Sequence, residues 1–476
     1  MLNIYTGRAG TGKTRAVMEE IAAAVRNKSG GRILVVPEQY SHEAERELCR
    51  VCGNSMSLYA DVMSFTGMAR TVLSRAGEGL PLLDKGGRIL CMALALDGLA
   101  SRLRVYGAAR RRPEMQTLLL SQLDELKTAC VSPDALTAAA DGCSGNLSDK
   151  LRDLALIAEA YDAVVSNGRA DPSDRLTRLA EAIPESDFGP ETYVYIDGFT
   201  DFTAQERRVI AELLKKGAEV TVCLTCGDGD SEVYAVPRAA MRALERTAGE
   251  LGEKVGHRSF EGAEGKKEPL KFFEDNMFTY TAARMDGGGA VSLYRASGVT
   301  AECELAAAEC VRLARETGCR WRDIAVAVRG FEDYRPALES MFAHYGVPLY
   351  LTRKSDMMSR PLPALIAGAY EIIAGGWESG DVFAYLRTGL AGLSPEETDE
   401  LENYVLMWNL RGSAWTRPGP WRQHPGGWGN EYTDETSEIL RRINDLRRRA
   451  ARPLEALAQA SSEAVTDAGQ IGRAHV

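Results

Sequence analysis

Residues 2–14 are Leu-Asn-Ile-Tyr-Thr-Gly-Arg-Ala-Gly-Thr-Gly-Lys-Thr, an apolar run that passes directly into a glycine-rich loop. The last eight of these residues fit the pattern G-x-x-x-x-G-K-[ST] in full. Glycines let backbone N–H groups turn inward around phosphates, and the N-terminus of a following helix adds partial positive charge. Lys13 is expected to reach the β- and γ-phosphates, and the Thr14 hydroxyl to ligate Mg²⁺. The predicted contacts to ATP are Gly7, Gly10, Thr11, Gly12, Lys13 and Thr14.

Strand and helix patterns alternate around this phosphate loop. Strands are expected at 32–36, 193–196 and 220–224, and helices at about 14–27 and 203–216. Such alternation predicts an α/β fold with a mostly parallel sheet covered by helices on both faces. Between about 66 and 185 the strand pattern gives way to leucine- and alanine-rich segments with helical spacing. This region is therefore predicted to be an all-helical insertion.

A second alternating unit begins near residue 291. Strands are expected at 291–295, 324–328 and 347–351, and helices at 301–316 and 334–345. After 380 the pattern becomes helical and irregular. Segment 411–431 carries Trp415, Trp421 and Trp428 among prolines and glycines, and we expect a loop or an interaction surface there. The polar stretch 257–270 is expected to be an exposed loop.

The chain ends in Ile-Gly-Arg-Ala-His-Val, residues 471–476. A common sequencing-adapter DNA translates into these six residues. We therefore expect a non-native tail here, although a natural flexible tail is the alternative.

Composition narrows the class of protein. The 476 residues are 45% apolar and 26% charged, which is typical of a folded soluble protein and excludes a mostly disordered chain. The net charge of −10 excludes a basic coat over the whole surface but leaves room for a local basic groove. The densest basic runs, Arg110–Arg112, Arg441–Arg442 and Arg447–Arg449, are either solvated helix faces or contacts to a phosphate backbone.

Cysteine usage and the absence of apolar runs indicate the compartment. Ten cysteines without a secretory signal are expected to be reduced thiols in a cytoplasmic protein, and no run approaches the roughly 18 apolar residues of a membrane span. The pairs Cys49/Cys52 and Cys223/Cys226 have zinc-site spacing, but they lie on a helix and after a buried strand. Ordinary thiols are the expected interpretation for both pairs.

The strand at 193–196 ends in Asp197, which is where a phosphate-loop protein places a second Mg²⁺ ligand. Motor ATPases generally have a glutamate at the next position to orient the attacking water, and this chain has Gly198. Asp201 is nearby but displaced, and Glu206 lies in the next helix. We therefore expect nucleotide binding without efficient hydrolysis. If only the acid is missing, Gly198→Glu should raise turnover in the full-length protein.

Several phrases in this order resemble superfamily 1 helicases of the UvrD type, and most closely the AddB family, which supplies one of the two chains of AddAB helicase–nucleases. Residues 4–14 and 195–199 (Tyr-Ile-Asp-Gly-Phe) carry part of the match. The others are Leu34-Val-Val-Pro-Glu-Gln-Tyr-Ser41, Met63-Ser-Phe65, Phe202-Thr-Ala-Gln-Glu206 and Ile324-Ala-Val-Ala-Val-Arg329. The Pro-Glu-Gln phrase together with Ile-Asp-Gly-Phe is specific, and the similarity runs to about residue 460.

The resemblance implies P-loop RecA-like domains with large helical insertions. The first RecA-like domain would span 1–65 and 190–285 around a helical insertion at 66–189. Residues 290–380 would form the beginning of the second RecA-like domain, and residues 381–470 its truncated helical insertion. The family's motor domains touch single-stranded DNA at positions matching Pro37, Glu38, Gln39, Ser64 and Phe65, and Arg329 matches the arginine that reaches towards the γ-phosphate.

The resemblance also implies partners and a cellular role. An AddA-like subunit would supply translocation in a heterodimer that binds single- and double-stranded DNA during double-strand break repair and recombination, in the cytoplasm at the nucleoid. The family's iron–sulfur cysteines and nuclease domain have no counterpart before Val476 and are expected only further along a longer protein. This chain alone should therefore show little or no activity.

Two other functions fit the same residues. One is a DNA-binding module with a purely structural ATP site, which an ATPase assay of the complete protein would distinguish. The other is a small-molecule P-loop kinase, which the second alternating unit and the Pro-Glu-Gln phrase disfavour. Because no glutamine loop precedes the first strand, we expect weak selectivity for the nucleobase.

Overall fold

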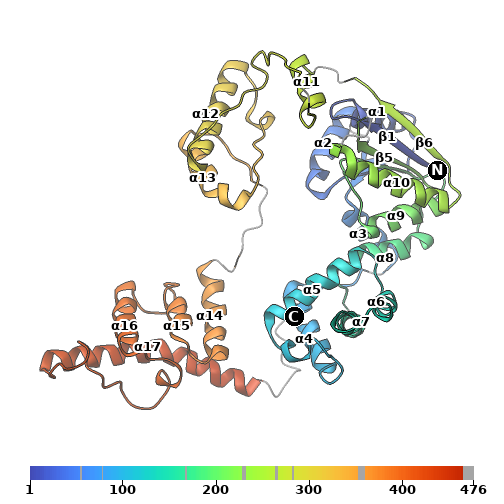
Figure 1. Ribbon diagram of the computed structural model, residues 1–476. Coiled ribbons are helices and arrows are strands. Elements are labelled where there is room, and N and C mark those ends of the chain that lie inside the picture. Colours follow the sequence, from blue (N-terminus) through green and yellow to red (C-terminus); the bar gives the residue numbers. More distant parts are fainter. Residues whose placement is uncertain are drawn as a thin grey trace. The chain divides into compact units, whose positions relative to one another are not determined.

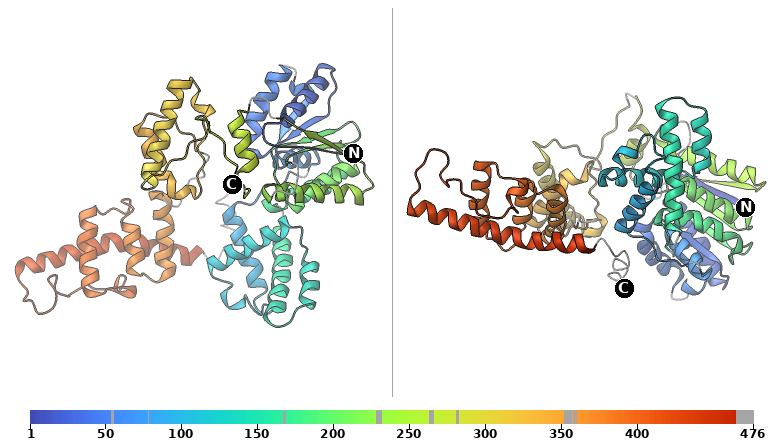
Figure 2. Two further views of the ribbon diagram at one scale, coloured as in Figure 1. Left: turned by 45° about the horizontal axis from the view of Figure 1, so that its top comes forward. Right: turned by 90° about the horizontal axis from the view of Figure 1, so that it is seen from below.

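The structure is a computed structural model that describes residues 1–53, 56–77, 79–166, 169–227, 232–262, 266–280, 283–351, 357 and 360–464. The chain divides into two compact units, residues 1–294 and 295–476, and each is described by itself. Figures 1 and 2 show their helices and strands. The tail at 471–476 lies outside the described residues.

The first unit is built on a six-stranded parallel sheet, which confirms the predicted α/β class with helical insertions. Its strands are β1 (Leu2–Gly7), β2 (Arg32–Val35), β3 (Ala60–Met63), β4 (Tyr193–Ile196), β5 (Glu219–Thr225) and β6 (Val255–Phe260). Their order across the sheet is β3-β2-β4-β5-β1-β6. Two strands, β3 and β6, form the edges and were not expected from sequence; β6 occupies part of the predicted loop at 257–270.

Helices cover both faces of this sheet (Figure 1). The helices that pack on the sheet are α1 (Lys13–Arg26), α2 (Ser41–Cys52), α3 (Phe65–Arg75), α8 (Arg175–Ala182), α9 (Ala204–Lys215) and α10 (Ala235–Glu250). The other helices of this unit are α4 (Lys85–Gly98), α5 (Pro113–Thr128), α6 (Pro133–Asp141), α7 (Asn146–Val165) and α11 (Glu268–Asn276). Successive side chains of a strand point to opposite faces. Ile33 and Val35 therefore pack with α3, α8, α9 and α10, whereas Leu34 and Val36 pack with α1 and α2.

The parallel arrangement brings every strand's carboxyl end to one edge of the sheet. The phosphate loop follows β1, Pro37 follows β2, Ser64 follows β3 and Asp197 follows β4. Open parallel sheets bind ligands at this edge. The fold therefore gathers residues that are far apart in sequence into one region.

Helices α4 to α7 of the helical insertion have their own apolar core, whereas α8 packs on the sheet. A buried carboxylate organises one of its turns: Asp153 on α7 is 1% exposed and accepts hydrogen bonds from three successive backbone N–H groups, at 3.0 Å from Arg104, 2.7 Å from Val105 and 3.1 Å from Tyr106. This one side chain satisfies a stretch of backbone that no helix or strand pairs.

We expect Asp153→Asn to lower the free energy of unfolding of the insertion by about 1–3 kcal/mol, because an amide loses charge-assisted bonds to buried N–H groups. The control is Asp149→Asn, one turn earlier on α7, which removes an exposed pair with Arg104. Surface pairs contribute at most about 1 kcal/mol. Hydrogen exchange at the amides of residues 104–106 measures the difference, and equal protection in both variants would contradict it.

In the described part of the second unit, all regular secondary structure is helical. Its helices are α12 (Val299–Thr317), α13 (Phe331–His344), α14 (Pro361–Gly375), α15 (Ser379–Leu386), α16 (Pro395–Trp408) and α17 (Asp434–Ala464). The two helices expected at 301–316 and 334–345 are confirmed by α12 and α13. Among the described residues of either unit, none of the helices has both the length and the apolar character needed to span a bilayer.

The strands expected at 291–295, 324–328 and 347–351 are wrong. The described residues of these three segments form no strand, although Ile324 has extended dihedral angles (φ −110°, ψ 130°). A strand requires a neighbour's backbone for its hydrogen bonds. Segments 324–328 and 347–351 pack against helices instead, whereas Val291, Leu293 and Tyr294 of the first segment are exposed. Residues 324–328 and 347–351 line a pocket of about 630 Å³ together with Leu338 and Phe342 of α13.

Two of the tryptophans at 411–431 are core residues, which corrects the alternative of an interaction surface there. Trp415 is 1% exposed, Trp421 is 0% exposed, and they pack at 5.3 Å between ring centroids. Trp428 is exposed. The segment is a loop that is held in place by its own buried tryptophans.

Candidate functional site

The phosphate loop connects β1 to α1 in a tight turn that only glycine permits at its first position. A Cβ on Gly7 would lie 2.5 Å from Thr11 Oγ1 and 2.6 Å from the carbonyl oxygen of Phe260. Lys13, on the first turn of α1, is 7% exposed. Its Nζ donates to the carbonyl oxygens of Gly7 at 2.7 Å and Arg8 at 2.8 Å, so the lysine ties the loop into a closed ring.

Burial lowers the pKa of Lys13, and the negative charge of Asp197 acts in the opposite direction. Lys13 follows the loop after β1 and Asp197 follows β4, and only β5 separates these two strands in the sheet. Two strand spacings amount to about 10 Å, a distance that a hydrated Mg²⁺ and a phosphate can occupy. Thr14 is exposed and Asp197 is half-buried at this edge, so both oxygens are available to a metal–phosphate complex.

Cysteines lie beneath this site but do not form a metal centre. Cys223 and Cys226 are buried, and burial raises the pKa of the Cys223 thiol. Among the described residues, no three or more His, Cys, Asp or Glu side chains are grouped to hold an ion. A magnesium held by one hydroxyl, one carboxylate and the nucleotide's own phosphates needs no such group.

Gly198 has a backbone conformation that disfavours any other residue. Its φ is +82°, and an added Cβ would lie 3.2 Å from Cδ of Pro37. The Gly198 N–H donates to Oδ1 of Asp197 at 2.9 Å. A glutamate here would carry left-handed backbone strain of about 1–2 kcal/mol and would press on Pro37. Gly198→Glu therefore strains the backbone in addition to supplying the missing carboxylate.

The two nearby carboxylates both accept hydrogen bonds from backbone N–H groups close to them in sequence. Asp201 is exposed and accepts from the N–H of Phe202 at 2.7 Å. Glu206 forms a capping box with Thr203 at the start of α9, where it accepts from the Thr203 N–H at 2.8 Å. Neither arrangement directs a carboxylate towards a water beside Asp197, which supports the expectation of slow hydrolysis.

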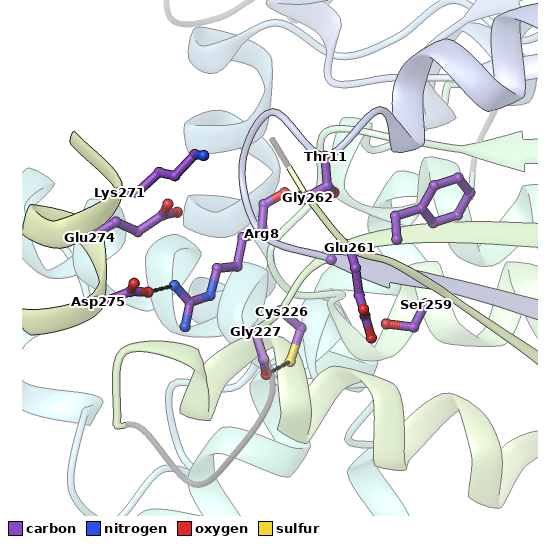
Figure 3. Close-up of a pocket in the computed structure, with 12 residues that line it drawn as sticks. Arg8, Thr11, Cys226, Gly227, Ser259, Glu261, Gly262, Lys271, Glu274 and Asp275 are labelled. Atoms are coloured by element: carbon purple, nitrogen blue, oxygen red, sulfur yellow. Dashed lines mark hydrogen bonds and ion pairs between the residues drawn. The ribbon is translucent and has the colours of Figure 1, made fainter. Parts of the chain in front are cut away.

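Helix α11 contacts the phosphate loop from a segment about 260 residues away in sequence. Lys266, just before the helix, donates to the Ala9 carbonyl at 3.1 Å, and Arg8 pairs with Asp275 on α11. Figure 3 shows this pair at the wall of a pocket of about 360 Å³ that opens beside Gly7. The sequence patterns did not predict these contacts, because 257–270 has the composition of an exposed loop and no pattern links Arg8 to Asp275.

The residues expected to contact DNA lie after β2 and β3. Pro37 caps a short 3-10 turn in which Glu38 and Gln39 are exposed. Ser64 accepts from the Gly67 N–H at 3.1 Å as the N-cap of α3. Phe65 requires a correction, because its ring is 4% exposed and packs against Phe199 at 5.5 Å. Phe65 positions this loop from within the core.

Arg329 is exposed and lies in the second unit, directly before α13. The phosphate loop lies in the first unit, so a contact of Arg329 with nucleotide stays a prediction.

A family model described as the N-terminal part of AddB matches residues 4–276, more than half of the chain. The chain belongs to the AddB family. The matched region contains all of the six-stranded sheet except the first two residues of β1, and also the phosphate loop, Asp197, Lys266 and α11. The helical insertion is likewise part of the AddB match.

Curated relatives extend the AddB match through the second unit. Proteins of Acetivibrio thermocellus (32% identical) and Desulforudis audaxviator (35%) each match 95% of this chain. A Heliobacterium modesticaldum protein is 34% identical over 94% of it. All three are named as the B component of an ATP-dependent helicase/deoxyribonuclease. The chain spans 41%, 41% and 39% of their lengths, respectively.

Proposed function

We propose that this chain forms the nucleotide-binding part of the AddB component of a bacterial ATP-dependent helicase–nuclease. The observation that carries the proposal is the meeting of a complete phosphate loop with Asp197 at one edge of the sheet. In this interpretation Lys13 neutralises phosphate charge, the backbone N–H groups of 7–14 cradle the phosphates, and Thr14 and Asp197 hold Mg²⁺. Bound Mg²⁺ would neutralise charge on the β- and γ-phosphates.

The DNA and partner roles belong to the same proposal. Exposed Glu38 and Gln39, beside Pro37 and the Ser64 cap, would contact single-stranded DNA along the carboxyl edge of the sheet. Relatives named as one component of a multi-chain enzyme support an AddA-like partner that supplies translocation, with duplex DNA as the substrate of the whole complex and double-strand break repair as its setting. We propose a cytoplasmic location for this complex, together with DNA at the nucleoid.

Magnesium dependence tests the metal part of the site. Chelation of Mg²⁺ should weaken ATP binding by roughly tenfold, since the metal offsets phosphate charge. Asp197→Asn should remove most of that dependence, while Asp187→Asn, an exposed aspartate before β4, should retain it. Calorimetric titrations with and without Mg²⁺ compare the variants. Equal Mg²⁺ dependence in Asp197→Asn and wild type would rule out this carboxylate as a ligand.

Nucleobase selectivity should be weak, because the firm contacts are to phosphates and Mg²⁺. We expect GTP to compete with ATP within about one order of magnitude. Competition against a fluorescent ATP analogue measures the ratio. A hundredfold preference for ATP would show that the pocket beside Gly7 recognises adenine, and Ser259→Ala would then identify a lining hydroxyl of that pocket.

A purely structural ATP site is the second candidate, favoured by the left-handed backbone of Gly198 and the local bonds of Asp201 and Glu206. This candidate differs from the first proposed function only in that the site would not hydrolyse ATP within the complete complex. ATP hydrolysis that depends on Lys13 of this chain would support the enzymatic role, and its absence the structural one.

A further inference from the structure

An arginine-rich groove lies in the helical part of the second unit, between α17 and segment 415–422. Its volume is about 1020 Å³. The arginines that line it are Arg417, Arg422, Arg441, Arg447, Arg448, Arg449 and Arg452. Asp445 and Glu455 are the acidic residues of the same lining. In a chain with a net charge of −10, this is a strong local excess of positive charge.

The exposed arginines form two rows. Arg441, Arg448 and Arg452 are seven and four residues apart on α17, so they share one face and extend over roughly 16 Å of helix. Arg417 and Arg422 line the groove from the loop between α16 and α17. Phosphates of a nucleic acid strand recur at spacings that such a row can follow.

Most of these guanidinium groups are not neutralised within the protein. Among the described residues, no carboxylate lies within ion-pair distance of Arg417, Arg422, Arg441 or Arg452. Arg448 is 69% exposed; it pairs with Asp445 at 3.4 Å and donates to the carbonyl oxygen of Asn444 at 3.3 Å. The positive charge of the groove is therefore available to a ligand.

A buried arginine builds the floor of the groove. Arg447 is 6% exposed and donates to the carbonyl oxygens of Trp415 at 2.9 Å, Arg417 at 2.7 Å and Gly419 at 2.8 Å. Burial lowers the pKa of Arg447, and the charge of Arg417 and Arg448 adds to this. Its guanidinium lies 5.0 Å from the centre of the Trp421 ring.

A second side chain of α17 holds the loop against the helix. Asn444 accepts from the Trp421 N–H at 2.7 Å and donates to the Trp421 carbonyl at 3.0 Å. The loop arginines are consequently held at a defined place beside α17 rather than on a loose segment.

We propose that this groove binds the sugar-phosphate backbone of duplex DNA. Arginine forks match phosphate oxygens and are weakly hydrated, which favours them at such contacts. The aromatic residues of the lining, Trp415 and Trp421, are buried, so no ring face is offered to an unstacked base. Single strands are usually held by such stacking platforms, whereas duplexes are held by charge along the backbone.

The inference rests on the proposed DNA role of the chain and adds a second place of contact in the other compact unit. Each neutralised phosphate contributes about 0.9 to the slope of log affinity against log salt concentration. Loss of three arginine contacts should therefore reduce that slope by about 2 to 3 and weaken duplex binding at least tenfold near 100 mM salt.

The test compares the whole chain with two triple variants. Arg441→Gln/Arg448→Gln/Arg452→Gln removes the α17 row. Arg312→Gln/Arg320→Gln/Arg335→Gln removes equal charge from two exposed arginines and one half-buried arginine, all paired with carboxylates elsewhere in the same unit. The probes are a labelled 20-base-pair duplex, a ten-residue oligo-dT and a polyglutamate competitor. All six tryptophans lie in the second unit, so tryptophan fluorescence reports whether that unit is folded in each variant.

The expected result is weaker duplex binding and a smaller salt slope in the groove variant alone, with oligo-dT and ATP affinities unchanged. Duplex binding equal to wild type would overturn the proposal. An equal loss of oligo-dT binding would assign the groove to single strands, and preference for polyglutamate over duplex would assign it to an acidic protein; either outcome also overturns it. Because ATP and oligo-dT report on the proposed function, its failure is separable from failure of the groove.

Discussion

Replacing Lys13 by alanine is expected to weaken ATP binding by about 10- to 100-fold. The Nζ of this lysine is the buried cation of the phosphate loop, and a hydrogen bond to a charged group contributes about 1.5–3 kcal/mol. The variant also removes the two bonds that tie the Gly7 and Arg8 carbonyls. Isothermal titration of folded protein with ATP–Mg²⁺ measures the change.

The matched control is Lys150→Ala, which removes an exposed lysine from α7 in the helical insertion of the same unit. Its ATP affinity should equal that of wild type. Circular dichroism should show that both variants retain the sheet and helices. Unchanged affinity in folded Lys13→Ala would falsify the nucleotide site, because no other lysine lies in the phosphate loop.

Local patterns predicted the central part of the fold well. The strands at β1, β2, β4 and β5 and helices α1 and α9 follow from apolar periodicity beside the glycine-rich loop, and parallel pairing places Asp197 near Lys13. Such signals depend on residues close in sequence. These elements can therefore be predicted without knowledge of the tertiary structure.

Features that depend on distant residues were not predictable. Arg8 meets Asp275 only because β6 and α11 return to the phosphate loop, and nothing near Arg8 encodes this. The apolar segments 324–328 and 347–351 have strand-like composition but pack on α12 and α13 without pairing. Composition alone does not distinguish a paired strand from an extended segment that packs on helices.

The burial of individual aromatic side chains was also not predictable from the sequence. Phe65 matched a family position for DNA contact, and its ring fills the core beside Phe199. Trp415 and Trp421 lay among prolines and glycines, where sequence allowed a surface, and they anchor the loop that carries Arg417. In both regions the aromatic rings are buried, so a ligand can reach only the exposed polar residues beside them.

The hydrolysis rate is where the site should differ most from an active motor. We expect turnover between about 0.001 and 0.1 s⁻¹, because loss of a positioned base costs roughly 10²- to 10⁴-fold against rates of about 10 s⁻¹. Phosphate release from the chain with ATP–Mg²⁺, with and without oligo-dT, measures it, and Lys13→Ala gives the background.

Two variants test whether the missing acid is what limits the hydrolysis rate. Gly198→Glu adds an acid but also strains a residue with φ +82° against Pro37, so its unfolding free energy must be compared with that of Gly198→Ala, which has the same strain without the carboxylate. A rise in turnover with Glu but not Ala would show that the missing acid alone limits the reaction. If the wild-type chain instead turns over at about 10 s⁻¹, another carboxylate must act as base. Asp201 is the first to replace by Asn, because its side chain is exposed and bonded only to its neighbour's N–H.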